Sequence, residues 1–195
     1  MKKKSIIISG TPGTGKSSIS KKLGESLGLK VINIGDLAIK ENFIISKDDK
    51  RDTLIIKEKK LISRLKKIIK NSETPLILEC HFADIIPSEF VELVIILRTH
   101  PLILEKRLEK KGYKKRKINE NVAAEILGVC TANALNKYDR DIIFEVDTSN
   151  LDIIQSVQTI LKIIKSRPRE YKVGHINWMK ELAMNKELEK FFNNK

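Results

Sequence analysis

One short stretch, residues 9–23 (SGTPGTGKSSISKKL), constrains the fold of this chain more than any other feature. It contains the pattern G-x-x-x-x-G-K-[ST], carried by Gly10, Gly15, Lys16 and Ser17. An apolar run (SIIIS) precedes the glycines and an amphipathic stretch follows them, which predicts a buried strand, a phosphate-binding loop and a helix. A glycine turn that arose by chance would not need a buried strand before it and a helix after it. The stretch therefore predicts a site for a nucleoside triphosphate.

Each residue type in the loop has a physical reason. Backbone N–H groups must close around phosphate oxygens, and larger side chains would block that approach. The space is provided by Gly10, Gly13 and Gly15. Lys16 can reach the β and γ phosphates, and the Ser17 hydroxyl can bind Mg²⁺, with Ser18 next to it. The helix that follows presents its positive end to the phosphates, so ATP with Mg²⁺ is the predicted cofactor.

Apolar runs alternate with amphipathic stretches along the rest of the chain, as is typical of α/β proteins. Buried strands are predicted at residues 5–9, 30–33, 75–79, 93–98 and 141–146. Helices are predicted at residues 16–28, 35–42, 56–70, 101–111, 119–135 and 148–165. A polar, charged segment is expected at 45–53 and a basic loop at 112–117. The predicted fold is an α/β P-loop NTPase with a five-stranded parallel sheet and helices on both faces.

Polar residues occur where two of the predicted strands end. Ligands of parallel sheets bind at the carboxyl ends of the strands, so residues 79–81 and 98–100 should meet the loop there. The candidate catalytic residues are Lys16, Glu79, His81 and Arg98. Glu79 can hold Mg²⁺ through water, which makes Ser17 and Glu79 the predicted metal ligands. A neutral His81 could orient a water molecule or accept its proton, although a structural, hydrogen-bonded histidine is the alternative.

The composition bounds the partners and the compartment. Lys+Arg 38 against Asp+Glu 25 gives a net charge of +13, which favours anionic partners, although a solvated lysine-rich surface would give the same total. Cys80 and Cys130 have no metal-binding spacing and fit a reducing compartment. The first apolar run covers only residues 6–8, and no stretch approaches about 18 apolar residues. A cytoplasmic protein without membrane association is expected.

Residues 136–139 (NKYD) match the N-K-x-D motif by which GTPases select guanine. That motif should follow a buried strand, whereas here it follows AEILGVCTANAL, which has the pattern of a helix. The chain also contains no D-x-x-G sequence to sense a γ-phosphate. A nucleotide switch is therefore not expected.

Five motifs occur in the order seen in adenylate kinases: GTPGTGKSS, VINIGDLA, LECH, VIILRT and LEKRLEKKGYKKRKINENVAAEI. The chain resembles that family over residues 4–165 and is most similar to the small branch known as adenylate kinase isoenzyme 6, as an archaeal member. The resemblance implies Mg²⁺-dependent transfer of phosphate from ATP to AMP or another nucleoside monophosphate, and ATPase activity. It also implies two partners, a platform protein of the small ribosomal subunit and pre-ribosomal RNA, with a role in late maturation of that subunit.

The resemblance further implies which segments bind each substrate. Residues 33–56 would bind the monophosphate through Asn33, Gly35, Asp36 and Arg51. Residues 110–120 would form a short lid over ATP, in which Lys111 stands where relatives often have arginine and cannot make arginine's two-pronged contact. Arg98 would steady phosphates. Glu79 stands where relatives usually have aspartate, and the histidine that matches His81 is linked to ATP hydrolysis.

The expected organisation is a kinase-like domain at residues 1–166 followed by a helical appendage at 167–195, which holds the single tryptophan. Three functions remain open at this point. The favoured one is a nucleoside monophosphate kinase that also hydrolyses ATP. The alternatives are a nucleotide-gated ribosome assembly ATPase with little kinase activity, and a small-molecule kinase for another acceptor, such as a shikimate-like compound.

Overall fold

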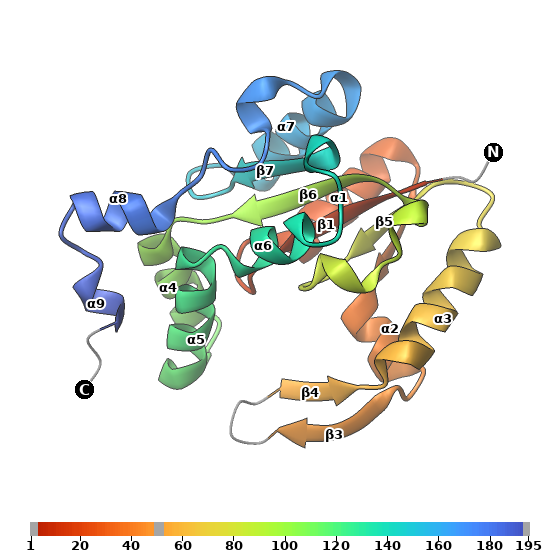
Figure 1. Ribbon diagram of the computed structural model, residues 1–195, viewed down its shortest axis with the longest axis horizontal. Coiled ribbons are helices and arrows are strands. Elements are labelled where there is room, and N and C mark those ends of the chain that lie inside the picture. Colours follow the sequence, from red (N-terminus) through yellow and green to blue (C-terminus); the bar gives the residue numbers. More distant parts are fainter. Residues whose placement is uncertain (1–3, 49–52, 193–195) are drawn as a thin grey trace.

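The computed structural model describes residues 4–48 and 53–192. Its main sheet has five parallel strands in the order β2-β5-β1-β6-β7 (Figure 1). The strands are β1 (Ser5–Gly10), β2 (Lys30–Asn33), β5 (Leu76–Glu79), β6 (Val91–Arg98) and β7 (Ile143–Asp147). The sequence prediction of a five-stranded parallel sheet is confirmed.

Helices surround this sheet on both faces. The described helices are α1 (Lys16–Leu27), α2 (Ile34–Lys40), α3 (Glu58–Lys70), α4 (Pro101–Lys110), α5 (Lys115–Ile126), α6 (Val129–Leu135), α7 (Ile153–Ser166), α8 (Trp178–Met184) and α9 (Glu189–Phe192). Within the described ranges, no helix is long and apolar enough to cross a membrane.

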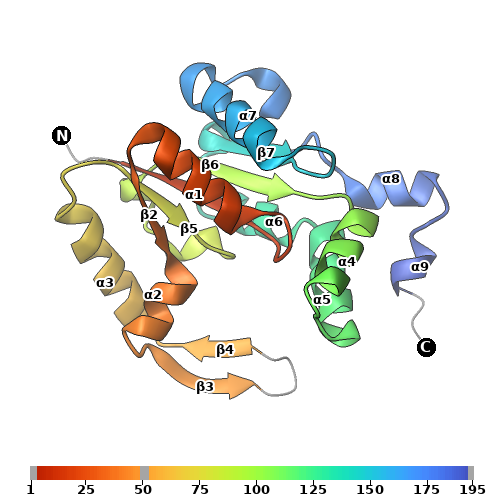
Figure 2. The same cartoon turned by 180° about the vertical axis from the view of Figure 1, so that it is seen from behind.

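Strand β1 is buried on both sides because its successive side chains point to opposite faces of the sheet. Ile6 and Ile8 pack in a core that includes side chains of α1 and α7. Ile7 packs in a second core, with side chains of α3 and α6. Figure 1 shows α6 in front of the sheet, and the reverse view in Figure 2 shows α1 in front of it. This double burial explains why the strands have continuous apolar runs.

A two-stranded antiparallel hairpin, β3 (Ile44–Asp48) and β4 (Thr53–Ile56), stands apart from the main sheet. The sequence prediction of a polar, charged segment at 45–53 did not include it. The hairpin buries little of its own surface, since Ile45 and Ile55 remain 61% and 47% exposed. Because few side chains of the hairpin are buried, its sequence shows little alternation of apolar and polar residues. That pattern is too weak to predict strands.

The single helix predicted at 119–135 is two helices, and this prediction was wrong. Gly128 has a φ of 64°, a left-handed conformation that ends α5 and redirects the chain into α6. The expected basic loop at 112–117 is also partly helical, because α5 begins at Lys115. NKYD follows α6, and the Tyr138 hydroxyl contacts the carbonyl oxygens of Ala83 and Ile86. The motif therefore follows a helix, as predicted.

A third apolar cluster lies between α4 and α5, outside the sheet. Leu104 and Leu108 of α4 pack there with Ile118 and Val122 of α5. Leu182 of α8 completes the cluster and is fully buried. The C-terminal helices, expected as an appendage, therefore pack on the α4–α5 pair, and both views show α8 and α9 beside that pair (Figure 1, Figure 2).

Candidate active site

The phosphate-binding loop connects the end of β1 to the start of α1, as predicted. Gly10 has a φ of 148°, and a Cβ atom there would lie 2.5 Å from the carbonyl oxygen of Leu97. Gly13 has a φ of 97°, and a Cβ atom there would lie 2.7 Å from Cδ1 of Leu104. A side chain at Gly10 would have to displace the loop or β6, and one at Gly13 would be strained by the positive φ and would have to displace the Leu104 side chain. Gly15 directly precedes the first turn of α1.

The Lys16 ammonium group lies over the loop. Its Nζ donates hydrogen bonds to the carbonyl oxygens of Gly10, at 2.7 Å, and Thr11, at 3.1 Å. Burial lowers the pKa of Lys16, because a charged ammonium loses hydration there. A phosphate oxygen would be a stronger acceptor than these neutral carbonyls, since a hydrogen bond between two charged groups is stronger. Lys16 thus lies at the loop, and its contact with the phosphates stays a prediction.

The two predicted metal ligands meet at the start of α1. The Ser17 hydroxyl donates to Oε1 of Glu79 at 2.6 Å. Glu79 ends β5 and pairs in register with Ile8 of β1, which places its carboxylate next to the loop. Magnesium usually takes one or two protein oxygens and completes its shell with phosphate oxygens and water. This hydroxyl and carboxylate fit that requirement, and the described residues contain no group of three or more His, Cys, Asp or Glu able to hold a metal.

His81 contacts the loop from the side of β5. Its Nδ1 lies 3.1 Å from the Gly10 carbonyl oxygen, the same atom that accepts from Lys16. A carbonyl can only accept, so Nδ1 carries the proton in this bond and Nε2 keeps its lone pair. Burial lowers the pKa of His81, which favours the neutral imidazole. The structure therefore brings His81 and Lys16 together, and leaves Nε2 with the capacity to accept a proton.

Arg98 is placed differently from the prediction. Its side chain is 3% exposed, and its guanidinium donates to Glu125 at 2.8 Å and to Glu145 at 2.7 Å. Contact with a phosphate would require Arg98 to leave two buried carboxylates unpaired, which is costly. The expected phosphate contact is replaced here by a buried ion cluster. A glutamate at position 145 inside an apolar strand was the sequence signal for a buried cation, since a buried carboxylate needs a partner.

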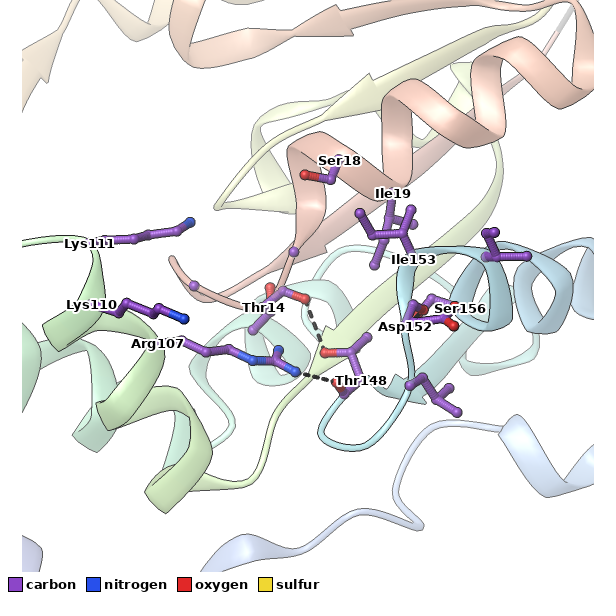
Figure 3. A pocket seen from close by; sticks show the side chains of 14 residues that line it. Thr14, Ser18, Ile19, Arg107, Lys110, Lys111, Thr148, Asp152, Ile153 and Ser156 are labelled. Carbon is purple, nitrogen blue, oxygen red and sulfur yellow. Dashed lines mark hydrogen bonds between the residues drawn. The ribbon is translucent and has the colours of Figure 1, made fainter.

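A cavity of about 690 Å³ opens beside the loop and between α1, α4 and the start of α7 (Figure 3). Its volume is within the range of small-ligand sites. Ser18 and Lys111, both predicted to contact ATP, line this cavity. Figure 3 shows Lys110 and Lys111 extending from the end of α4 toward the loop. The structure therefore joins the predicted lid lysine to the loop across one cavity, which we call the donor cavity.

Arg107 also lines the donor cavity, and sequence reasoning missed it. Its Nη2 donates to the carbonyl oxygens of Thr148, at 2.7 Å, and Ser149, at 3.1 Å. The Thr148 hydroxyl in turn donates to the carbonyl oxygen of Thr14 in the loop, at 3.0 Å (Figure 3). The available signal was helical spacing, since Arg107 precedes Lys111, the residue that caps the end of α4, by four residues.

A second, mostly aliphatic cavity of about 220 Å³ lies between α2, the β3–β4 hairpin and the residues after β5. Gly35 and His81 line it, so one predicted acceptor residue is at this cavity. Asn33 instead caps α2, because its Oδ1 accepts from the backbone N–H of Asp36 at 3.0 Å. Arg51 lies outside the described residues. We call this the acceptor-side cavity.

Comparisons with known proteins agree with this architecture. A family model described as an AAA domain matches residues 6–128. A Methanocaldococcus jannaschii protein named "Putative adenylate kinase" is 38% identical over 173 residues, covering 89% of this chain and 92% of that protein. A Pyrococcus furiosus protein of the same name is 35% identical over 175 residues, covering 90% and 91%. A solved shikimate kinase from Bacteroides thetaiotaomicron aligns over 83% of this chain and 98% of its own, with a TM-score of 0.53 and 16% identity, which shows a shared fold only.

Proposed function

Because this chain belongs to the family of these archaeal adenylate kinase relatives, we propose that it transfers the γ-phosphoryl group of ATP to AMP, giving two ADP. The observation that carries the proposal is the position of the loop between two cavities. The donor cavity is lined by Gly13 and Gly15, and the acceptor-side cavity is lined by His81, which bonds to Gly10. A donor and an acceptor could therefore meet at Lys16.

Phosphoryl transfer needs in-line positioning and neutralisation of charge more than covalent help from the protein. The γ-phosphorus bond to ADP would break while a bond to an acceptor phosphate oxygen forms, and Lys16 would hold the phosphates during this exchange. Lys110 and Lys111 would add positive charge from the α4 side of the donor cavity. Ser17 and Glu79 would hold Mg²⁺, which when bound supplies further charge neutralisation on the phosphates.

We expect AMP to be phosphorylated by this chain when it is mixed with ATP and Mg²⁺. The measurement follows ADP formation with each of the common nucleoside monophosphates as acceptor, and follows phosphate release in parallel. ADP produced in excess of released phosphate supports the kinase. If no monophosphate raises ADP above the amount of released phosphate, the kinase is contradicted and a hydrolase remains.

The same site is proposed to hydrolyse ATP when water replaces the acceptor. Nε2 of His81 could then orient that water or accept its proton, and general base catalysis typically contributes about 10²–10⁴-fold in rate. We expect His81→Ala to lower phosphate release about a hundredfold and phosphoryl transfer to AMP much less. His81→Asn is the matched variant, because an amide N–H can still donate to the Gly10 carbonyl while no base remains. Equal losses of both reactions in the two variants would assign His81 to the scaffold.

The pH dependence of phosphate release provides a separate test of His81. The base is the deprotonated imidazole, so its contribution is complete above its pKa and is lost as the pH falls through it. Burial lowers that pKa below its ordinary value of 6.5. We expect phosphate release to persist down to pH 6.5 and to decline only below it, measured as initial rates with ATP well below its KM, so that the profile reports the protein without bound nucleotide. A decline centred above pH 6.5 that is absent from His81→Asn would contradict this.

A nucleotide-gated assembly ATPase is the second candidate, and it rests on the resemblance described above. The net charge of +13 and the exposed lysines of α3 would suit an acidic protein surface or RNA. This function predicts slow basal hydrolysis that a ribosomal platform protein or pre-ribosomal RNA stimulates, with little ADP formed from AMP. The acceptor assay above, repeated with those partners, distinguishes the two functions.

A further inference from the structure

The chain after α7 is joined to the nucleotide side of the fold by residues 172–184, here called the C-terminal strap. The strap first lies along β7, where the N–H of Val173 donates to the carbonyl of Ile143 at 3.3 Å. The N–H of Gly174 then donates to Oε2 of Glu145 at 2.8 Å. The strap ends in α8, which lies beside α4 and α5 in both views (Figure 1, Figure 2).

Trp178 anchors the strap in the buried ion cluster. It is the only tryptophan of the chain, and it is 5% exposed. Its indole ring meets the His100 ring edge-on, with 5.3 Å between ring centroids. Its Nε1 donates to Oε1 of Glu125 at 3.1 Å. The strap therefore bonds to the Glu125 carboxylate, which also accepts hydrogen bonds from other residues near the site.

Glu125 joins three other partners to the strap. Its Oε1 also accepts from Nε of Arg98 at 2.8 Å and from the N–H of Thr99 at 3.1 Å. Its Oε2 accepts from the hydroxyl of Thr11, a residue of the phosphate-binding loop, at 2.6 Å. Glu125 is 1% exposed, so these bonds lie away from water, where hydrogen bonds are stronger.

Thr11 carries this connection to Lys16. While its hydroxyl is bound by Glu125, its carbonyl accepts from the Lys16 ammonium at 3.1 Å and from the Thr14 hydroxyl at 2.8 Å. Trp178, Glu125, Thr11 and Lys16 thus form one continuous series of hydrogen bonds. Thr11 is oriented in part by the Glu125 carboxylate, which the strap helps to hold together with Arg98 and Thr99.

The C-terminal strap is also connected to the phosphate-binding loop by apolar packing. Leu182 is fully buried against Leu104 and Leu108 of α4. These two leucines fill the space beside Gly13, where an added Cβ would lie 2.7 Å from Leu104 and 3.1 Å from Leu108. The strap therefore supports the loop at Thr11 through hydrogen bonds and at Gly13 through packing.

We propose that Trp178 and Leu182 are positioning residues that hold the phosphate-binding loop and α4 in their nucleotide-binding arrangement. The inference uses the proposed function only in that ATP binds at the loop. A strap that holds the loop in this arrangement favours nucleotide binding, and that coupling is reciprocal. Nucleotide bound at the loop therefore strengthens the contact between the strap and Glu125, and loss of the Trp178–Glu125 hydrogen bond weakens nucleotide binding.

The test measures binding of a non-hydrolysable ATP analogue with Mg²⁺ by titration calorimetry, which requires no turnover. Trp178→Phe keeps one aromatic ring but removes the N–H donor together with the second ring of the indole, and Glu125 retains its bonds from Arg98, Thr99 and Thr11. We expect it to weaken the analogue about fivefold. Met179→Ala, an exposed neighbour on α8, is the matched control and should bind as the unmodified chain does.

A double-mutant cycle separates positioning from general support of the fold. Thr11→Val removes the hydroxyl and should also weaken binding about fivefold, whereas Thr11→Ser should restore it. In the Trp178→Phe background, Thr11→Val should cost less than about twofold more, because both changes break the same series of bonds. Unchanged affinity in Trp178→Phe, or fully additive losses, would overturn the proposal.

The fluorescence of the unmodified chain gives a second test that does not depend on variants. Since Trp178 is the only tryptophan, its emission reports on the strap alone, and saturating analogue should shift it. An unchanged spectrum at saturation overturns the coupling. Failure of the unmodified chain to bind the analogue at all would instead contradict the proposed function, which calorimetry shows directly.

Discussion

Lys16→Ala is expected to lower both phosphoryl transfer to AMP and phosphate release by about a hundredfold or more, the usual effect of removing one preorganised donor from a developing negative charge. Lys16 is the ammonium that lies on the loop, bonded to the carbonyls of Gly10 and Thr11. Both reactions pass through the same phosphates, so both rates should fall together. Initial rates of ADP and phosphate formation provide the measurement.

The matched control is Lys21→Ala, which removes an equal charge from an exposed position on the same helix. The rates of Lys21→Ala should stay within about twofold of those of the unmodified chain, because solvent and salt screen an exposed charge from the phosphates. Thermal unfolding of both variants checks that each is folded. A Lys16→Ala variant that is folded and keeps more than about a tenth of either activity would contradict the role of the loop.

Arg98→Met is expected to lower the free energy of unfolding by about 3–5 kcal/mol, the typical result of removing one partner from a buried ion pair. The Arg98 guanidinium is the ionic partner of Glu125 and Glu145, and both carboxylates are at most 1% exposed. Methionine fills a similar volume but leaves these carboxylates without their cation. Urea unfolding of the variant and the unmodified chain measures the difference.

Arg167→Met is the control for this change, since Arg167 pairs with Glu92 at the surface, at 3.3 Å. Exposed pairs contribute about 0–1 kcal/mol, so this variant should unfold almost like the unmodified chain. A loss of less than about 1 kcal/mol in Arg98→Met would mean that Arg98 is free to act elsewhere, including on phosphates.

The parts of the fold that the sequence predicted are those whose signals are local. The loop at residues 10–17 has its own spacing, and the strands at 75–79 and 93–98 are continuous apolar runs because both faces of the sheet are covered. Ser17 and Glu79 could be paired in advance, since carboxyl ends of parallel strands share one edge of a sheet.

The features that the sequence did not predict depend on contacts between distant residues. Arg98 has the same appearance at a strand end whether it faces a phosphate or a carboxylate, and Glu125 lies 27 residues away in the chain. The family resemblance implies that Asn33 binds the acceptor, but an asparagine before a helix is equally suited to cap that helix. Gly128 divides one predicted helix into two. The sequence did not predict this break, because a glycine within an amphipathic pattern does not reveal its φ angle.

The fate of the γ-phosphate tests the central claim most directly. ATP labelled at that phosphate is mixed with the protein, Mg²⁺ and AMP, and the label is followed into ADP and into free phosphate. We predict that most of the label appears in ADP while AMP is present, and in free phosphate when AMP is omitted. Label that enters free phosphate alone, at the same rate with and without AMP, would contradict a monophosphate kinase.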